Sequence, residues 1–353
     1  MKKILFISYL SKENEGRIKR HYEHFENNGA FEIELIQGCV TSEDKSSEKN
    51  VINIMLNKSS NIGRFFEFFC AVKKILKEKK YDYIFLNNYF TAIFSFFVSG
   101  DKTIYDAYEL YYPGCGKKMS LRDYFFYLCE KKVIKKSKYV ISTNEERAFV
   151  MVGVYKLDKI PIIVKNVPVE FDRTLVESSR KHAIVYAGYL SEERGIIDLI
   201  DAVKVYNSRY NKKIALDIFG YGELETQIKV LCDENSEINY LGKYKNDNIN
   251  SILKNYEIGY IGYSNEEINT VLCSPNKLYD YIVNENVIIG NDNYSLVKFI
   301  NKFKIGEAGN DMLDNIEKVV NNFEKYFNQV RNVKRTLDFS HEYDKITELV
   351  GKE

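Results

Sequence analysis

The sequence SPNKLYDYIV, residues 274–283, predicts a helix whose N-terminus is suited to a ligand. Pro275 is one of four prolines in the chain, and it suits the first position of a helix with Ser274 before it as the N-cap. Apolar residues at 278, 281 and 282, and then at 287–289, supply the face that this helix would bury. A helix N-terminus carries unpaired N–H groups and about half a positive charge, so Lys277 in the first turn makes this end a candidate phosphate site.

One turn further on, Asp280 is placed to accept hydrogen bonds from the hydroxyl groups of a sugar. An ordinary capped helix, with Lys277 and Asp280 facing water, explains this stretch about equally well when it is taken alone. The rest of the chain is needed to choose between the two interpretations.

Length and charge restrict the class of protein. A chain of 353 residues exceeds one ordinary core, so two domains are expected. The 51 basic and 50 acidic side chains leave a net charge of +1, whereas nucleic-acid-binding domains usually carry a strong basic excess, so we expect no nucleic-acid partner. The six cysteines form no C-x-x-C pair and the four histidines show no metal-ligand spacing with them, which favours reduced thiols, no metal site and a cytoplasmic location.

No segment is long enough to be expected to cross a membrane. The start, MKKILFISYL, predicts a first strand and not a signal peptide, because charged residues follow where a small-residue cleavage site would be needed. The apolar stretch 90–98 is far shorter than the roughly 20 residues that span a bilayer.

The first half of the chain alternates between short apolar runs and amphipathic segments. Such runs are typical of strands buried on both faces of a parallel sheet, and they occur at 3–8, 31–36, 51–56, 83–86, 102–105, 139–142 and 162–166. Helices are predicted at 18–27, 63–80 and 121–138. Helical spacing predicts that the last two bury Phe65, Phe66, Phe68, Phe69, Val72, Ile75 and Leu76, and Phe125, Phe126, Leu128, Cys129, Val133 and Ile134.

The second half repeats this rhythm, with strands predicted at 183–187, 214–219 and 238–241 and helices at 196–207 and 223–234. We therefore expect an α/β protein of two Rossmann-like domains facing across a cleft. The expected boundaries are an N-terminal domain at 1–168, a polar linker at 169–180, a C-terminal domain at 181–335 and a C-terminal helix at 336–353. Packing of that helix against the N-terminal domain is one possibility.

Polar residues follow the predicted strands at the places where such sheets bind ligands. In the N-terminal half, a polar loop containing Gly16 and Arg17 follows the first strand, and Asp106, Tyr108 and Glu109 follow the strand at 102–105. In the C-terminal half, the turn Gly188-Tyr189 follows a strand and Arg194 precedes a glycine at a helix start, while Gly220-Tyr221-Gly222 follows the next strand.

A basic cluster lies around the helix predicted at 121–138, beside the aromatic run 124–127. Its cations are Lys117, Lys118, Arg122, Lys131, Lys132, Lys135, Lys136 and Lys138, against two acids, Asp123 and Glu130. Complementation of the helix dipole explains the lysines at the C-terminal end of the helix. The cations ahead of the helix favour an anionic membrane surface, at about 1 kcal/mol per basic residue.

In their order and spacing these motifs resemble GT-B fold glycosyltransferases of family 4, over nearly the whole chain. The loop YAGYLSEERGI, residues 186–196, resembles the opening loop of that family's C-terminal domain, Gly220-Tyr221-Gly222-Glu223 resembles its strand-end glycine pair, and SPNKLYDY resembles its donor-site helix. In the N-terminal half, Gly16-Arg17-Ile18 resembles the loop after its first strand, and Asp106-Ala107-Tyr108-Glu109 its D-x-H-E element.

The resemblance implies transfer of a sugar, with retention of configuration, from a nucleotide-sugar on the C-terminal domain to a glycan or lipid-linked acceptor on the N-terminal domain. The implied setting is bacterial-type surface polysaccharide synthesis, in the cytoplasm or peripherally on the inner face of the membrane. The catalytic residues that it implies are Arg194, Lys277, Glu109 and Tyr108. The implied donor contacts are Gly188, Tyr189, Gly220, Tyr221, Gly222, Ser274, Pro275, Asn276, Leu278 and Asp280, and the implied acceptor contacts are Gly16, Arg17 and Asp106.

Three positions depart from the family pattern. Tyr189 stands where family members often have arginine, so Lys277 would have to supply that charge. The usual acid eight residues before Asp280 is Leu272 here, and Glu266 or Glu267 is a candidate to replace it. Tyr108 stands in place of the usual histidine, which removes a group that can share a proton near neutral pH.

The chemistry of sugar transfer agrees with these residues. Negative charge grows on the leaving diphosphate, and Arg194, Lys277 and the helix N-terminus can stabilise it without a metal. No D-x-D motif stands at a strand end, so neither a metal nor another cofactor is expected. A nucleotide-sugar epimerase of the same fold stays an alternative, although it would need carboxylates and histidines for proton transfer. A non-catalytic relative that binds a nucleotide-sugar or a partner enzyme is the other alternative.

Overall fold

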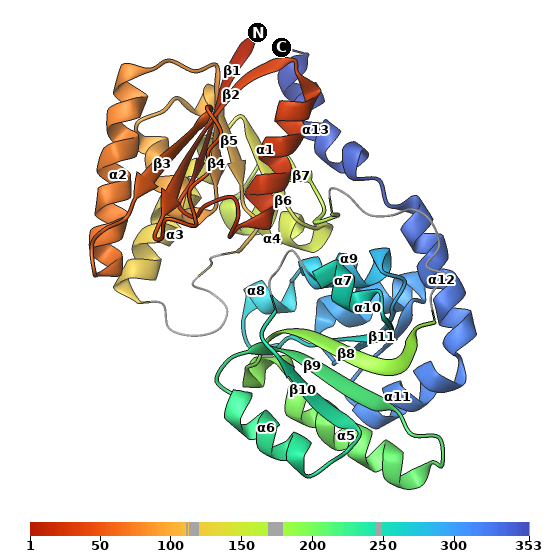
Figure 1. Cartoon of the computed structure of the whole chain (residues 1–353). Helices are drawn as coiled ribbons and strands as arrows, with labels where there is room; N and C mark the ends of the chain where they lie inside the picture. Colours follow the sequence, from red (N-terminus) through yellow and green to blue (C-terminus); the bar gives the residue numbers. More distant parts are fainter. Residues whose placement is uncertain (111, 113–119, 169–178, 245–248, 353) are drawn as a thin grey trace. The chain divides into compact units, whose positions relative to one another are not determined.

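The computed structural model describes residues 1–110, 112, 120–168, 179–244 and 249–352, shown as a cartoon in Figure 1. The chain divides into two compact units. Unit 1 comprises Met1–Val169 and Phe339–Glu353, and unit 2 comprises Glu170–Asp338. Most of the predicted linker, residues 169–178, lies outside the described residues.

Unit 1 is built on a parallel sheet of seven strands in the order β3-β2-β1-β4-β5-β6-β7. The strands are β1 (Lys2–Ser8), β2 (Phe31–Cys39), β3 (Val51–Met55), β4 (Tyr83–Asn87), β5 (Thr103–Asp106), β6 (Tyr139–Ser142) and β7 (Ile162–Ile163). The apolar run predicted as the first strand lies inside the sheet, between β2 and β4, where Ile4, Leu5, Phe6 and Ile7 are fully buried.

The helical elements of unit 1 cover this sheet (Figure 1). They are α1 (Gly16–Asn28), α2 (Asn61–Glu78), the 3-10 helices η1 (Tyr89–Phe96) and η2 (Gly100–Lys102), α3 (Leu121–Lys136), α4 (Glu145–Tyr155) and α13 (Phe339–Gly351). Helix α13 comes from the far end of the chain and contacts α1. The Ser60 side chain caps α2, and α1 ends at Gly29, whose φ of 67° suits glycine.

Unit 2 has a parallel sheet of six strands in the order β10-β9-β8-β11-β12-β13. They are β8 (Lys181–Tyr189), β9 (Ala215–Tyr221), β10 (Ile238–Gly242), β11 (Tyr256–Ile261), β12 (Val287–Gly290) and β13 (Gly306–Ala308). Its helical elements are η3 (Glu192–Arg194), α5 (Ile196–Arg209), α6 (Glu225–Asp233), α7 (Ile249–Leu253), α8 (Ile268–Val271), α9 (Asn276–Val283), α10 (Tyr294–Phe303), α11 (Met312–Asn321) and α12 (Phe323–Thr336).

The same topology recurs in both sheets and positions the candidate sites. The strand order reverses beside the first strand of each unit, between β1 and β4 in unit 1 and between β8 and β11 in unit 2. In open parallel sheets of this kind, the loops that leave the carboxyl ends diverge at the reversal and leave room for a ligand. The prediction of two Rossmann-like domains is therefore confirmed.

Several local predictions were wrong in detail. Helix α9 begins at Asn276 with Pro275 as its N-cap, one residue later than predicted. The apolar residues 287–289 belong to strand β12 and not to the helix, which ends at Val283. Three side chains that were predicted to be buried are exposed: Phe66 of α2, and Phe125 and Leu128 of α3.

Candidate functional site

The N-terminus of α9 presents Lys277 beside the carboxyl end of β8. The Lys277 ammonium lies 4.2 Å from the centroid of the Tyr186 ring, a favourable contact between a cation and an aromatic face. No carboxylate of the described residues lies within ion-pair distance of this ammonium. Its charge is therefore available to a ligand.

Arg194 supplies a second cation at the carboxyl edge of the same sheet. Its guanidinium lies 4.0 Å from the centroid of the Tyr263 ring, and its Nη1 atom is buried without a hydrogen-bond partner among the described residues. The backbone is held by Tyr260, whose hydroxyl donates to the Arg194 carbonyl at 2.9 Å and to the Gly195 carbonyl at 3.1 Å. A buried N–H group without a partner is costly, and an anion bound here would satisfy it.

The electrostatics of Lys277 fit the same interpretation. Burial and the nearby charge of Arg194 lower the pKa of Lys277 to about 7, while Asp280 acts in the opposite direction. Two cations that destabilise one another in the free protein would both be stabilised by a bound diphosphate. Lys277 and Arg194 are therefore the candidate anion-binding residues of unit 2.

Glycine at two predicted positions allows this arrangement. A Cβ atom at Gly188 would collide with the Lys277 ammonium, so a larger residue there would move the lysine from its place against β8. Gly220 has a φ of 149°, and a Cβ atom there would collide with the backbone carbonyl of Gly188. The two glycines therefore keep the neighbouring strand ends close together.

Further tyrosines lie at or near the carboxyl ends of β8, β9 and β10. Tyr189 and Tyr221, both half exposed, meet edge to face with their ring centroids 5.6 Å apart. Burial and the charge of Asp280 raise the pKa of Tyr244 to about 12, which places this carboxylate near that ring. The structure thus brings Gly188, Lys277, Arg194 and Asp280 into one neighbourhood.

The other predicted donor residues lie on α8, α9 and the loops beside them, or after β9. Leu272, where the family has an acid, is buried at the end of α8. Glu266 is exposed and Glu267 partly exposed just before α8, and whether either replaces the missing acid stays a prediction. Ser274 and Asn276 flank the start of α9, Leu278 packs in the core, and Gly222 follows β9.

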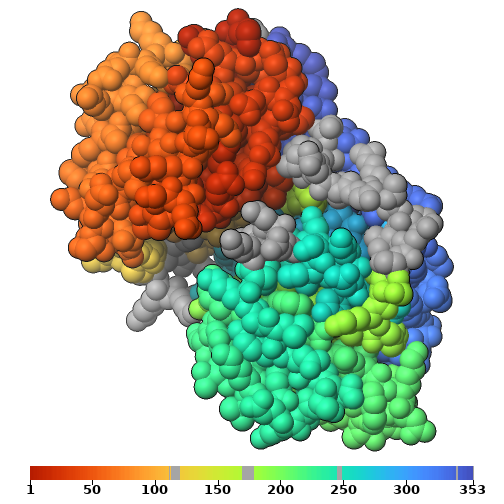
Figure 2. All heavy atoms as spheres, in the orientation of Figure 1, coloured from red at the N-terminus to blue at the C-terminus, as the bar shows by residue number. Residues whose placement is uncertain are grey.

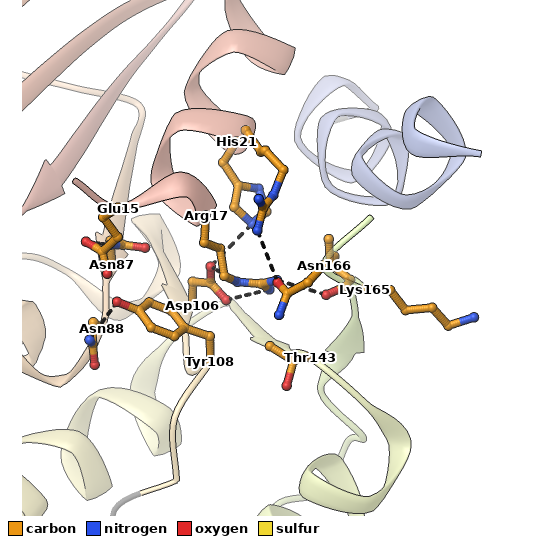
Figure 3. A network of polar contacts seen from close by, with 12 residues as sticks. Glu15, Arg17, His21, Asn87, Asn88, Asp106, Tyr108, Thr143, Lys165 and Asn166 are labelled. Atoms are coloured by element: carbon orange, nitrogen blue, oxygen red, sulfur yellow. Dashed lines mark hydrogen bonds and ion pairs between the residues drawn. The ribbon is translucent and has the colours of Figure 1, made fainter. Parts of the chain in front are cut away.

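In unit 1 the predicted residues Arg17 and Asp106 are bonded to one another (Figure 3). The Arg17 guanidinium donates to both Asp106 oxygens, at 2.7 and 2.9 Å, and to the Asn166 side chain at 2.6 Å. Burial alone would raise the pKa of Asp106, but the Arg17 charge and His21 outweigh it and hold the pKa at about 2. His21 Nε2 lies 3.3 Å from Asp106, and burial lowers the pKa of His21 to about 4, so the imidazole is neutral.

The other predicted residues of unit 1 lie around this buried pair. Tyr108, in the position of the family's histidine, accepts a hydrogen bond from Asn88 Nδ2 at 2.7 Å, and Arg147 donates to its carbonyl. Asn88 itself has a φ of 68°, a strained value for a residue other than glycine. Glu109 is partly exposed and Gly16 is exposed at the start of α1.

Sequence reasoning missed several members of these sites. In unit 1 it missed the buried His21 and the pair formed by Glu15 and Asn87, which Figure 3 shows side by side. In unit 2 it missed the rings of Tyr186 and Tyr263 that face the two cations. Position carried a signal for Asn87 and Tyr263, which end β4 and follow β11, whereas His21 lies inside α1 and carried none.

Two negative findings concern the described part of the chain. There, no group of three or more His, Cys, Asp or Glu side chains is placed to hold a metal ion. No helix in the same residues has both the length and the apolar character needed to cross a bilayer.

Comparison with known proteins gives a likeness in structure only. No family model matches the chain, and no curated protein matches its sequence. The solved structure of HepE from Anabaena in complex with UDP and glucose has a TM-score of 0.72 at 14% identity and covers 100% of both chains. WaaG, a glycosyltransferase involved in lipopolysaccharide biosynthesis, has a TM-score of 0.72 at 12% identity, covering 98% of this chain and 99% of its own.

Sucrose-phosphate synthase from Thermosynechococcus elongatus has a TM-score of 0.74 at 11% identity, covering 100% of this chain and 99% of its own. Identities this low establish the fold and leave the reaction open. The chain therefore has the fold of these glycosyltransferases, the GT-B fold, along its whole length.

Proposed function

We propose that this protein is a glycosyltransferase that transfers a sugar from a nucleotide-sugar to a glycan or lipid-linked acceptor. The observation that carries the proposal is the pair formed by Lys277 and Arg194, two cations without an acidic partner among the described residues, at the carboxyl edge of unit 2. In the proposed complex they hold the diphosphate of the donor. The fold is one that supports this chemistry in the structures to which the chain is similar.

Each donor-side residue has a distinct role in the proposed reaction. Lys277, Arg194 and the N–H groups at the start of α9 stabilise the negative charge that grows on the leaving diphosphate. Asp280, one turn into α9, accepts hydrogen bonds from the ribose hydroxyls. Reaction without a metal and with retention of configuration remains part of the proposal.

Ligands bound in a similar structure guide the choice of donor. HepE was solved with UDP and glucose, so UDP-sugars are the first donors to test. The acceptor is less restricted, because this fold occurs both in WaaG, which takes part in lipopolysaccharide biosynthesis, and in a sucrose-phosphate synthase. We propose that the reaction belongs to the synthesis of a surface polysaccharide.

Turnover with a panel of UDP-, GDP- and ADP-sugars tests the proposal, with release of the nucleoside diphosphate and transfer of the labelled sugar as readouts. We expect sugar transfer that depends on an added acceptor. An epimerase would instead change the configuration of the donor sugar without an acceptor. A non-catalytic relative would bind a nucleotide-sugar, raising the melting temperature, and turn nothing over.

A face of unit 1 supports a membrane-borne acceptor. We call it the aromatic face, and it consists of exposed side chains of α2, η1 with its C-cap, and α3, namely Phe66, Phe96, Phe97, Phe125 and Leu128. Helix α2 lies at the surface of unit 1 (Figure 2, orange). Packed rings join parts of the face, since Phe69 lies 6.4 Å from Phe66 and 5.7 Å from Phe97.

Basic side chains accompany the aromatic face. The ammonium groups of Lys73 and Lys132 lie 4.9 Å and 3.0 Å from the ring centroids of Phe97 and Phe96. Lys135 and Lys136 are exposed at the end of α3, whereas the predicted cations Lys117 and Lys118 lie outside the described residues. Apolar rings with a basic surround match the interface of an anionic leaflet.

Co-sedimentation with liposomes tests this part of the proposal. Binding should require anionic lipid, weaken at high salt and fall when Lys131, Lys132, Lys135 and Lys136 are changed to glutamine. A matched control changes four lysines of unit 2 to glutamine, at positions 212, 213, 302 and 304. Equal pelleting of both variants, or none of the wild type with anionic lipid at low salt, would exclude membrane binding by this face.

A further inference from the structure

The reversal of strand order in unit 1 brings together two polar side chains. Strand β1 ends at Ser8 and the adjacent strand β4 ends at Asn87. From β1 the chain continues to β2 on one side, and from β4 it continues to β5 on the other. The carboxyl ends of β1 and β4 therefore mark the position where a sheet of this topology accepts a ligand.

Glu15 is anchored at this position. Although it is the N-cap residue of α1, its side chain makes no capping hydrogen bond. Instead its Oε2 atom accepts from Ser8 Oγ at 3.0 Å and from Asn87 Nδ2 at 2.8 Å. The Glu15 side chain is partly exposed, and its Oε1 atom bonds to none of the described residues.

Asn87 provides an independent sign of a missing partner. Only 1% of this residue is exposed, and its Oδ1 atom is buried with no hydrogen-bond partner among the described residues. A buried carbonyl oxygen without a partner is costly, so a donor is expected to meet it in the functional state. The neighbouring Asn88, with its strained backbone, helps to fix the end of β4 through its bonds to Tyr108 and to the backbone of Tyr89.

The other charged groups of this region are already engaged. Arg17 is bonded to Asp106 and to Asn166, and both ionic side chains are buried. They can shape the site, but a ligand would have to break their bonds in order to reach them. A ligand can therefore bond to Glu15 Oε1 and Asn87 Oδ1 without breaking the bonds between Arg17 and Asp106.

We propose that Glu15 binds the acceptor of the transfer reaction, through a hydrogen bond from Oε1 to a hydroxyl oxygen of the acceptor sugar. The same hydroxyl donates its hydrogen to Asn87 Oδ1, so that one sugar hydroxyl is bonded to both Glu15 Oε1 and Asn87 Oδ1. Ser8 and Asn87 position the carboxyl group. This inference rests on the proposed glycosyltransferase function and adds Glu15 to the acceptor-binding residues expected in unit 1.

Protonation of Glu15 follows from its surroundings. Burial, together with the negative charges of Glu109 and Asp106, raises the pKa of Glu15 to about 8, against the hydrogen bonds from Ser8 and Asn87, which lower it. Arg17, the cation two residues along, is bonded to Asp106. Below about pH 8 the carboxyl group is neutral and Oε1 can donate, and above that pH the donor is lost.

The test compares the wild type with Glu15→Gln, Glu15→Ala and the control Glu13→Gln, which changes an exposed carboxylate of the same loop. The probes are octyl glycosides of glucose, galactose, mannose and N-acetylglucosamine, with the donor found in the nucleotide-sugar screen. The acceptor kcat/KM and the donor KM are measured from pH 6 to pH 9. In parallel, the carboxyl carbon of Glu15 is followed by carbon-13 NMR, assigned by its absence from Glu15→Gln.

We expect the acceptor KM of the wild type and of Glu13→Gln to rise above about pH 8. Glu15→Gln keeps a donor group, so its KM should stay within about threefold of the wild type at pH 7 and no longer depend on pH. Glu15→Ala should raise the acceptor KM about tenfold, the scale of one lost hydrogen bond, with the donor KM unchanged.

Two results would overturn the inference: a wild-type acceptor KM and pH profile in Glu15→Ala, or a loss in Glu15→Gln as large as that in Glu15→Ala. Failure of the proposed function is distinguishable, because the wild type would then transfer no sugar from any donor. In that case the NMR signal decides. A shift of the Glu15 carboxyl carbon on addition of an octyl glycoside supports a sugar site, and no shift with any of the four overturns it.

Discussion

Units 1 and 2 both have cations near the carboxyl edge of the sheet, but only the cation of unit 1 is paired with a carboxylate. In unit 1 the Arg17 guanidinium is buried against Asp106, which it contacts with two hydrogen bonds. In unit 2, Lys277 and Arg194 lie over tyrosine rings, and neither has a carboxylate within ion-pair distance among the described residues. Arg17 is therefore needed to neutralise the buried Asp106, whereas the charges of Lys277 and Arg194 are available to a substrate.

The pKa values express the same contrast. Arg17 and His21 outweigh burial and hold the pKa of Asp106 at about 2, so the charged form is stabilised in the folded chain. Burial and Arg194 lower the pKa of Lys277 to about 7, so there the charged form is destabilised. Four variants and one binding measurement test this comparison.

The largest effect is expected on stability, from breaking the buried pair. Arg17→Met leaves Asp106 buried without its cation, which should lower the free energy of unfolding by about 3–5 kcal/mol. Because the folded pKa of Asp106 lies below its ordinary value, its stabilising contribution is present above about pH 4 and is lost as the pH falls through 2. Urea denaturation at pH 7 measures the loss.

The matched control for this variant is Lys277→Met, which removes an unpaired cation and should cost no stability. The double variant Arg17→Met/Asp106→Leu should recover most of the loss, since it leaves no buried charge alone. An equal loss in Arg17→Met and Lys277→Met would contradict the contrast between the two units.

The next effect is expected on turnover. Arg194→Ala and Lys277→Ala should each reduce kcat about a hundredfold or more, the scale of losing one preorganised group that stabilises transition-state charge. Lys229→Ala, a change at an exposed lysine of α6, should retain the wild-type rate. Wild-type rates in both site variants would remove the basis of the proposed function.

A smaller effect is expected from Asp280→Asn. It should weaken UDP binding about fivefold to tenfold, as loss of one hydrogen bond to the ribose would, and leave the melting temperature unchanged, because a partly exposed carboxylate contributes little to stability. Calorimetry with UDP measures the affinity, with Asp233→Asn as the control at an exposed carboxylate. Unaltered affinity in Asp280→Asn would show that this carboxylate does not hold the ribose.

The sequence predicted the α/β rhythm and the loops that bear the candidate residues, because apolar runs and strand-end glycines are local signals. It did not predict that Arg17 binds Asp106, a contact between residues 89 positions apart. Periodicity also placed Phe66 and Phe125 in the core, since an apolar stripe does not reveal whether another element covers it. Strand β11 escaped notice because its glycine and tyrosines dilute the apolar run.

Proton uptake on binding of UDP tests the central claim most directly, that Lys277 is left unpaired for the donor diphosphate. With a pKa of about 7, the free lysine is mostly neutral at pH 8, and the diphosphate would raise that pKa. Calorimetry at pH 8 in two buffers of different ionisation enthalpy should therefore show uptake of close to one proton by the wild type, and none by Lys277→Met with weakened affinity. Tight binding by both proteins without proton uptake by either would contradict it.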